Sequence, residues 1–66
     1  MVSYQAWVSI YFEIVEKRGA QIDDIDDGGT VMRLAADGWN QNRRTLHRAT
    51  RSKAADIALR HLRRQR

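Results

Sequence analysis

The chain has 66 residues, of which 12 are Lys or Arg and 8 are Asp or Glu, and it contains neither Cys nor Pro. This length leaves room for one domain, and so small a core is usually supplemented by disulfides, a metal or self-association. The absence of Cys excludes disulfides, and it leaves His47 and His61 as the only nitrogen donors for a structural zinc site. We therefore expect no metal and no other cofactor, and we expect self-association instead. The same absence agrees with a reducing cytoplasm, where we place the protein.

The net charge of +4 is unevenly distributed along the chain. Residues 1–38 hold three basic and seven acidic side chains, a balance of −4, together with four of the five aromatic residues. Residues 39–66 hold nine basic side chains and one acidic side chain, a balance of +8. Such asymmetry predicts a polyanion partner for the basic part of this single domain, residues 1–66. No apolar stretch approaches the roughly 20 residues of a membrane span, so no membrane partner is expected.

Residues 2–18 fit two patterns that lead to different folds. With a period of 3.6 residues, the apolar side chains form one stripe and the charged ones collect on the opposite face, as in an amphipathic helix. With a period of two, the apolar residues from Val2 to Ile14 fall on one side, as in a half-buried strand. We favour the helix because Ser3 can act as its N-cap and Gly19 suits its C-terminal end. The helical stripe consists of Tyr4, Trp7, Val8, Tyr11, Ile14 and Val15.

The centre of the chain is acidic and contains glycine. Four aspartates precede Gly28 and Gly29, which is typical of a solvated loop. The composition is similar to that of a calcium loop, but the regular alternation of oxygen ligands is missing, so no metal site is predicted. A hairpin closed at Asp27 and Gly28 is the alternative. The four aspartates are Asp23, Asp24, Asp26 and Asp27.

Two or three further helices are predicted after the acidic centre. The first spans residues 30–37 and stops at Gly38. A second helix capped by Asn40 and a third capped by Ser52 follow, although a continuous helix over residues 41–64 is sterically acceptable. The predicted fold class is therefore all-α, with three or four short helices. The alternative is an α+β fold with an N-terminal strand or hairpin and a C-terminal helix.

Residues 31–48 resemble the general helix-turn-helix pattern, with a helix, a turn at Gly38 and a following helix rich in amide and guanidinium groups. The sequence departs from that pattern at Arg44, where an apolar residue is usual. Arg makes bidentate contacts with guanine, and Asn or Gln with adenine. The residues predicted to read bases are Gln41, Asn42, Arg44 and Arg48. Those predicted to contact phosphates are Arg43, Arg51, Lys53, Arg60, Arg63 and Arg64.

The N-terminal segment concentrates more aromatic surface than a small monomer readily covers. We therefore predict a homodimer, in which two copies bury this surface against each other. The residues predicted at the dimer interface are Tyr4, Trp7, Tyr11 and Ile14.

Catalysis is not expected from this sequence. A nucleophile needs a base and an orienting group beside it, and the sequence places no such set together. His47 and His61 stand among arginines and are predicted to lie at the surface or to contact phosphate, and not to act as general bases. The functional prediction is a small nucleic-acid-binding regulatory or accessory protein, with DNA ahead of RNA. The alternative is a protein-interaction module, such as a small inhibitor, antitoxin or viral accessory factor, that docks on another protein through its charge-separated faces.

Overall fold

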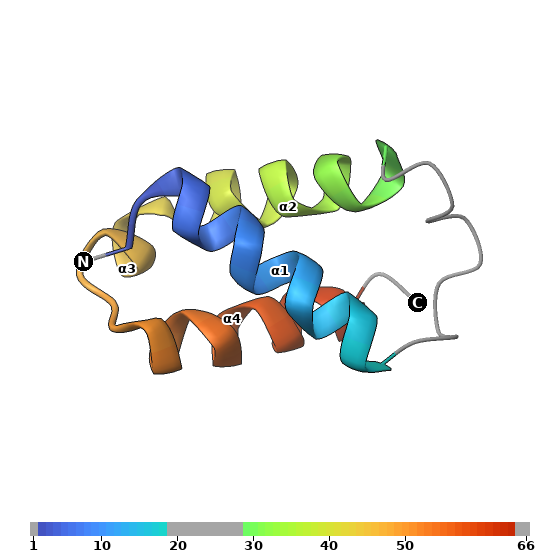
Figure 1. Ribbon diagram of the computed structural model, residues 1–66. Helices are drawn as coiled ribbons and strands as arrows, with labels where there is room; N and C mark the ends of the chain where they lie inside the picture. Colours follow the sequence, from blue (N-terminus) through green and yellow to red (C-terminus); the bar gives the residue numbers. More distant parts are fainter. Residues whose placement is uncertain (1, 19–28, 65–66) are drawn as a thin grey trace.

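The computed structural model of the chain describes residues 2–18 and 29–64, and these contain four helices and no strand. The helices are α1 (Tyr4–Arg18), α2 (Gly29–Gln41), α3 (Arg43–His47) and α4 (Arg51–Arg64). Figure 1 shows α2 and α4 running antiparallel, with α1 packed across both of them and the short α3 at one end. The all-α prediction is confirmed, and the strand interpretation of the N-terminal segment is wrong. The predicted Gly19 cap and the acidic loop or hairpin turn lie outside the described residues.

α1 begins where the sequence predicts, because Ser3 caps it. The Ser3 Oγ atom accepts a hydrogen bond from the backbone N–H of Ala6 at 3.1 Å. The buried face of the helix consists of Trp7, Ile10, Tyr11 and Val15. This face differs from the predicted stripe, since Ile10 enters the core and Tyr4 stays 39% exposed. The reason is that α1 packs against two helices, α2 and α4, and therefore needs a wider apolar arc than one stripe supplies.

The turn predicted at Gly38 is wrong, because this residue lies inside α2, which continues to Gln41. A Cβ atom on residue 38 would stand 3.0 Å from Cζ2 of Trp7 and 3.2 Å from the ring of His61. The glycine therefore serves the close approach of α1 and α4 to α2, and not a change of chain direction. α2 ends at Gln41, and the backbone N–H and side-chain Nδ2 of the next residue, Asn42, both donate to the Gly38 carbonyl at 3.0 Å.

α3 and α4 are separate helices, so the continuous-helix alternative is wrong. Asn40 was predicted to cap the second helix after the acidic centre, but it lies within α2. α4 is capped by Thr50 and not by Ser52, because the Thr50 Oγ1 atom accepts a hydrogen bond from the backbone N–H of Lys53 at 3.2 Å. The break between α3 and α4 reverses the chain, which places α4 antiparallel to α2 (Figure 1).

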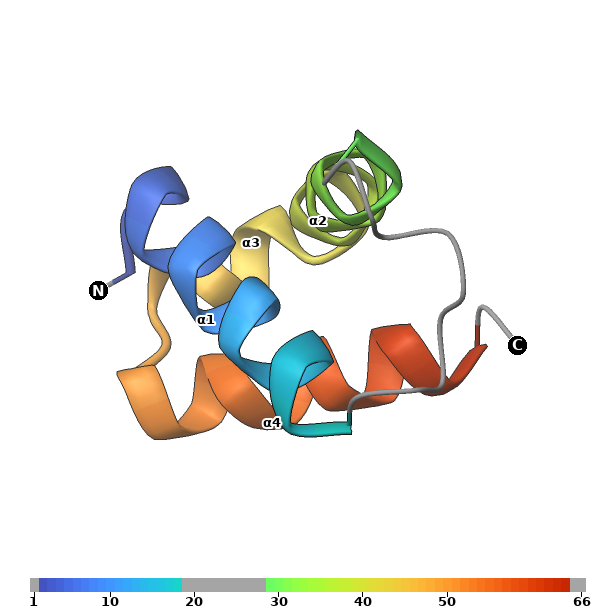
Figure 2. The same cartoon turned by 45° about the vertical axis from the view of Figure 1, so that its right-hand side comes forward.

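α4 crosses α1 obliquely, as Figures 1 and 2 show. It contributes apolar side chains and one histidine to the core. Its buried residues are Ala54, Ile57, Ala58, His61 and Leu62. α3 contributes Leu46, which is 0% exposed, and Ala49 is buried just after this helix. None of the helices in the described ranges is long and apolar enough to cross a membrane.

Candidate nucleic-acid interface

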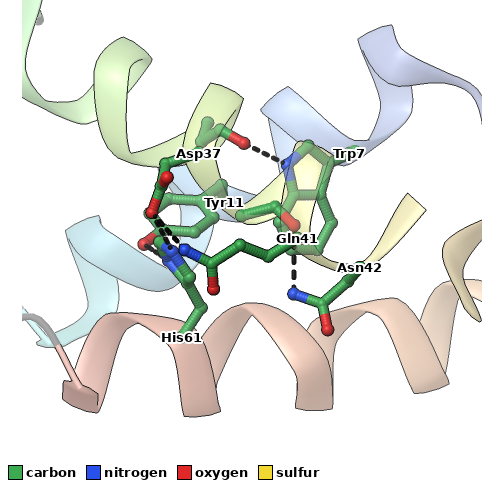
Figure 3. Close-up of polar contacts among 8 residues, drawn as sticks. Trp7, Tyr11, Asp37, Gln41, Asn42 and His61 are labelled. Carbon is green, nitrogen blue, oxygen red and sulfur yellow. Dashed lines mark hydrogen bonds and ion pairs between the residues drawn. The ribbon is translucent and has the colours of Figure 1, made fainter.

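A chain of hydrogen bonds runs from the core to the surface through three helices (Figure 3). His61 on α4 is 3% exposed, and its Nδ1 atom lies 2.7 Å from the hydroxyl oxygen of Tyr11 on α1. Its Nε2 atom lies 2.9 Å from Oδ2 of Asp37 on α2, which also accepts a hydrogen bond from Gln41 Nε2 at 2.8 Å. A carboxylate only accepts, so His61 donates from Nε2, and in the tautomer that carries its proton on Nε2 the Nδ1 atom accepts the hydroxyl proton of Tyr11. The surface position predicted for His61 is therefore wrong.

The Tyr11 hydroxyl is sealed inside the protein. Burial raises the pKa of this group well above its ordinary value of 10.0, and the negative charge of Asp37 raises it further. The indole Nε1 of Trp7 is also satisfied internally, by the Ala35 carbonyl at 2.7 Å. Within the described part of the chain, every buried side-chain nitrogen or oxygen has a hydrogen-bond partner. These hydrogen bonds fix the relative positions of α1, α2 and α4.

α3 presents nearly all of its side chains to solvent. Leu46 anchors the helix in the core, while its neighbours are exposed. A hollow on this surface is lined by Arg43, Arg44, Thr45, His47 and Arg48. Arg43 Nη2 donates to Asn40 Oδ1 at 2.8 Å, whereas Arg44 and Arg48 form no hydrogen bond or ion pair with another described side chain. Two guanidinium groups are therefore free to bind an anion.

Two further hollows continue from the one on α3. The second is lined by residues 40–45 and shares Arg43, Arg44 and Thr45 with the first. The third shares Asn42 with the second, and its other lining residues lie on α4. These α4 residues are Ile57, Arg60, His61 and Arg64. We call the residues that line the three hollows the basic track, and no acidic side chain is among them.

The basic track brings together most of the residues predicted to contact nucleic acid. They are Gln41, Asn42, Arg43, Arg44, Arg48, Arg60 and Arg64. Arg51 and Lys53 are exposed in the first turn of α4, and Arg63 is exposed in its last turn, but none of the three lines these hollows. The structure therefore joins two basic segments that are distant in the sequence, and Asn42 is the residue at which they meet.

Two of the four residues predicted to read bases are engaged within the protein. The Gln41 amide donates to Asp37, and the Asn42 amide donates to the Gly38 carbonyl. Both side chains therefore stabilise the end of α2. Arg44 and Arg48 are the predicted base readers whose polar groups remain free.

Some residues that line the basic track were not predicted from the sequence. Asn40 and Thr45 line the track, and so does His47, whose predicted surface position is confirmed. The buried role of His61 was detectable, because this residue follows Ile57 by four positions on the apolar stripe of α4. Its arginine neighbours in the sequence obscured that spacing.

The residues predicted at a dimer interface divide into two groups. Trp7 and Tyr11 are each 0% exposed within a single chain, so they pack in their own core and offer no surface to a second copy. Tyr4 is exposed and lies edge-on to Trp39, with ring centroids 5.3 Å apart, and Ile14 is half-buried. A homodimer therefore stays a prediction, and Tyr4 and Ile14 are the predicted residues that retain surface for it.

The chain has no significant match to any protein-family model, curated protein or solved structure. Its function must therefore be inferred from the geometry and charge of its own surface.

Proposed function

We propose that the chain binds nucleic acid through the basic track, with duplex DNA as the preferred form, and acts as a small regulatory or accessory protein in the cytoplasm. The observation that carries this proposal is that three hollows share lining residues with one another and are lined by guanidinium groups and by no carboxylate. Nucleic acid is a polyanion whose phosphates repeat along a line, and arginine forms bidentate hydrogen bonds with phosphate. The arginines that line the three hollows match such a ligand in charge.

Contact with the phosphate backbone fits the track better than base reading by an inserted helix. α3 has 5 residues, which corresponds to a length of about 7.5 Å. Arg44 and Arg48 remain the candidates for base contact, because a guanidinium group can bond to guanine in the major groove of DNA. The major groove of duplex RNA is too deep and narrow for this, and we therefore place DNA ahead of RNA.

The proposal is tested by the fluorescence anisotropy of a labelled random-sequence DNA duplex, with an RNA duplex of equal length measured in parallel. The test variant replaces Arg44 and Arg48 by Gln. The matched control replaces Lys17 and Arg33 by Gln, which are exposed and line none of the three hollows. Both variants carry the same net charge.

We expect the test variant to bind DNA at least about tenfold more weakly than the control variant. The slope of log affinity against log salt should fall by about 0.9 for each phosphate contact that is lost. If the unmodified chain shows no binding even at low salt, the proposal is refuted. Equal losses in the two variants would mean that affinity follows net charge and not the basic track.

The alternative proposal is a protein-interaction module, and it uses the same surface. A track without carboxylates also matches an acidic protein surface by charge. Competition with poly-glutamate separates the two ligand classes. If poly-glutamate displaces the DNA at equal charge concentration, the track selects acidic groups in general. If DNA is retained, phosphate is the preferred ligand.

A further inference from the structure

The third hollow differs from the other two in size and in construction. It lies between the end of α2 and the second half of α4, and its volume is about 70 Å³. The two hollows along α3 have volumes of about 470 and 760 Å³. A small hollow of this kind suits a single ion, whereas the larger ones suit an extended ligand.

Arg60 and Arg64 both line this small hollow. They stand four positions apart and therefore on the same face of α4, where two like charges destabilise the helix. Neither forms a hydrogen bond or an ion pair with another described residue. A tetrahedral oxyanion between the two guanidinium groups would relieve this repulsion and accept several charge-assisted hydrogen bonds.

The wall of the hollow is rigid and offers a further donor. His61 lines it with a ring whose two nitrogens are already bonded to Tyr11 and Asp37, so the ring keeps its position. The Asn42 amide uses Nδ2 to bond to the Gly38 carbonyl, which leaves a second N–H on the same nitrogen. The Asp37 carboxylate opposes an anion by charge, but it accepts two hydrogen bonds and is not among the lining residues.

We infer that the hollow formed by Arg60, Arg64 and Asn42 is a binding site for one phosphate group, separate from the contacts along α3. The assignment of this phosphate to a nucleic-acid backbone rests on the proposed function. A purely structural role for Arg64 is the competing explanation, because it lies in the last turn of α4, where cations interact favourably with the helix dipole. That explanation applies to Arg63 as much as to Arg64, and Arg63 does not line the hollow. The two explanations therefore predict different results for these neighbours.

The test is a titration of the full chain with inorganic phosphate, followed by NMR of the arginine Nε–H groups and the Asn42 side-chain amide. We expect the signals of Arg60, Arg64 and Asn42 to shift along one saturating curve, and the signal of Arg63 to drift without saturation. The variant R60Q/R64Q should weaken phosphate binding about tenfold. The matched variant K17Q/R33Q has the same net charge, and it should change phosphate binding less than about twofold, as expected for screened charges at exposed positions outside the hollow.

Two outcomes would overturn the inference. One is the absence of saturation at Arg60 and Arg64, and the other is equal weakening in both double variants. Helical circular dichroism of each variant confirms that it is folded, so a loss of binding is not a loss of structure. Failure of the proposed function looks different: the hollow would still saturate with inorganic phosphate while the chain fails to bind DNA. Conversely, DNA binding with no saturation at the hollow removes only the phosphate site.

Discussion

The hydroxyl of Tyr11 and Nδ1 of His61 lie 2.7 Å apart, although 50 positions separate these residues in the sequence. The hydrogen bond joins α1 to α4, and the bond from His61 to Asp37 extends the connection to α2. The two rings also meet edge to face, with centroids 5.7 Å apart. The chain has no disulfides, and this hydrogen bond is a specific polar link between α1 and α4. Apolar contacts are not directional, so the bond adds a constraint on how the two helices are positioned.

The Tyr11–His61 contact should appear as a coupling energy. Tyr11→Phe leaves His61 Nδ1 buried without a donor, and His61→Leu leaves the Tyr11 hydroxyl without an acceptor, so each should lower the free energy of unfolding by about 1 to 3 kcal/mol. The double variant leaves neither group unpaired at this contact, and its loss should be smaller than the sum of the single losses by about 0.5 kcal/mol or more. Urea unfolding followed by circular dichroism measures all three. Strict additivity would show that the bond contributes nothing of its own.

Alkaline pH should destabilise the protein through Tyr11. The folded chain holds the Tyr11 proton above pH 10.0, where a tyrosine in the unfolded chain loses it, because burial and Asp37 raise the pKa of the folded state. The folded state then binds more protons than the unfolded state, so stability falls as pH rises. The contribution is complete below pH 10.0 and is lost above it.

The comparison that isolates this effect is with Tyr11→Phe. The variant lacks the buried hydroxyl, so its free energy of unfolding should fall less steeply above pH 10.0 than that of the unmodified chain. Urea unfolding at several pH values on both sides of this point gives the two slopes. Identical slopes would mean that Tyr11 does not titrate differently in the folded and unfolded states.

Gly38→Ala should destabilise α2 although alanine is the better helix former. The added Cβ would lie 3.0 Å from Trp7 and 3.2 Å from His61, and overpacking of this kind costs about 1 to 3 kcal/mol. The gain in helix propensity is at most about 1 kcal/mol. Met32→Ala, at an exposed position of the same helix, is the control and should stay within about 0.5 kcal/mol. The measurement is the thermal unfolding midpoint of each variant. A midpoint for Gly38→Ala above that of the unmodified chain would contradict the close packing at this position.

Trp7→Ala should unfold the chain and not merely separate two copies. The indole is 0% exposed within one chain, and truncating such a side chain costs about 3 to 5 kcal/mol, a large part of the stability of a small domain. Tyr4→Ala, at an exposed position, should cost much less. The predicted homodimer is tested separately, by measuring the unfolding midpoint of the unmodified chain at several protein concentrations. A midpoint that rises with concentration would indicate that association stabilises the fold, as in a dimer.

Local signals in the sequence were sufficient for the secondary structure of α1. Ser3 is a side chain that caps the helix through its own neighbours, and the period of 3.6 residues needs no knowledge of distant segments. The same kind of reasoning failed at Gly38. Glycine favours turns, and it also lets neighbouring side chains approach the backbone closely. At Gly38 the second property applies, because Trp7 and His61 lie where a Cβ atom would be, and their positions cannot be read from the local sequence.

The candidate site was predictable in composition but not in arrangement. The charge count along the sequence identified the basic half of the chain. Arg44 and Arg48 belong to this half, and both are exposed and line the α3 hollow. The junction at Asn42 depends on how the end of α2 packs on α4, which no local pattern encodes. Likewise, the choice between Thr50 and Ser52 as cap follows from where α3 must end for Leu46 to reach the core.

The anchoring of α3 by Leu46 has a consequence for how this protein can change. Fold and recognition are encoded at different positions, because Leu46 faces the core and the five side chains beside it that line the α3 hollow face solvent. Substitutions at those five positions alter the ligand surface at little cost in stability. α3 is therefore an exchangeable element, on which selection or a designed library could produce new specificities without repacking the three long helices.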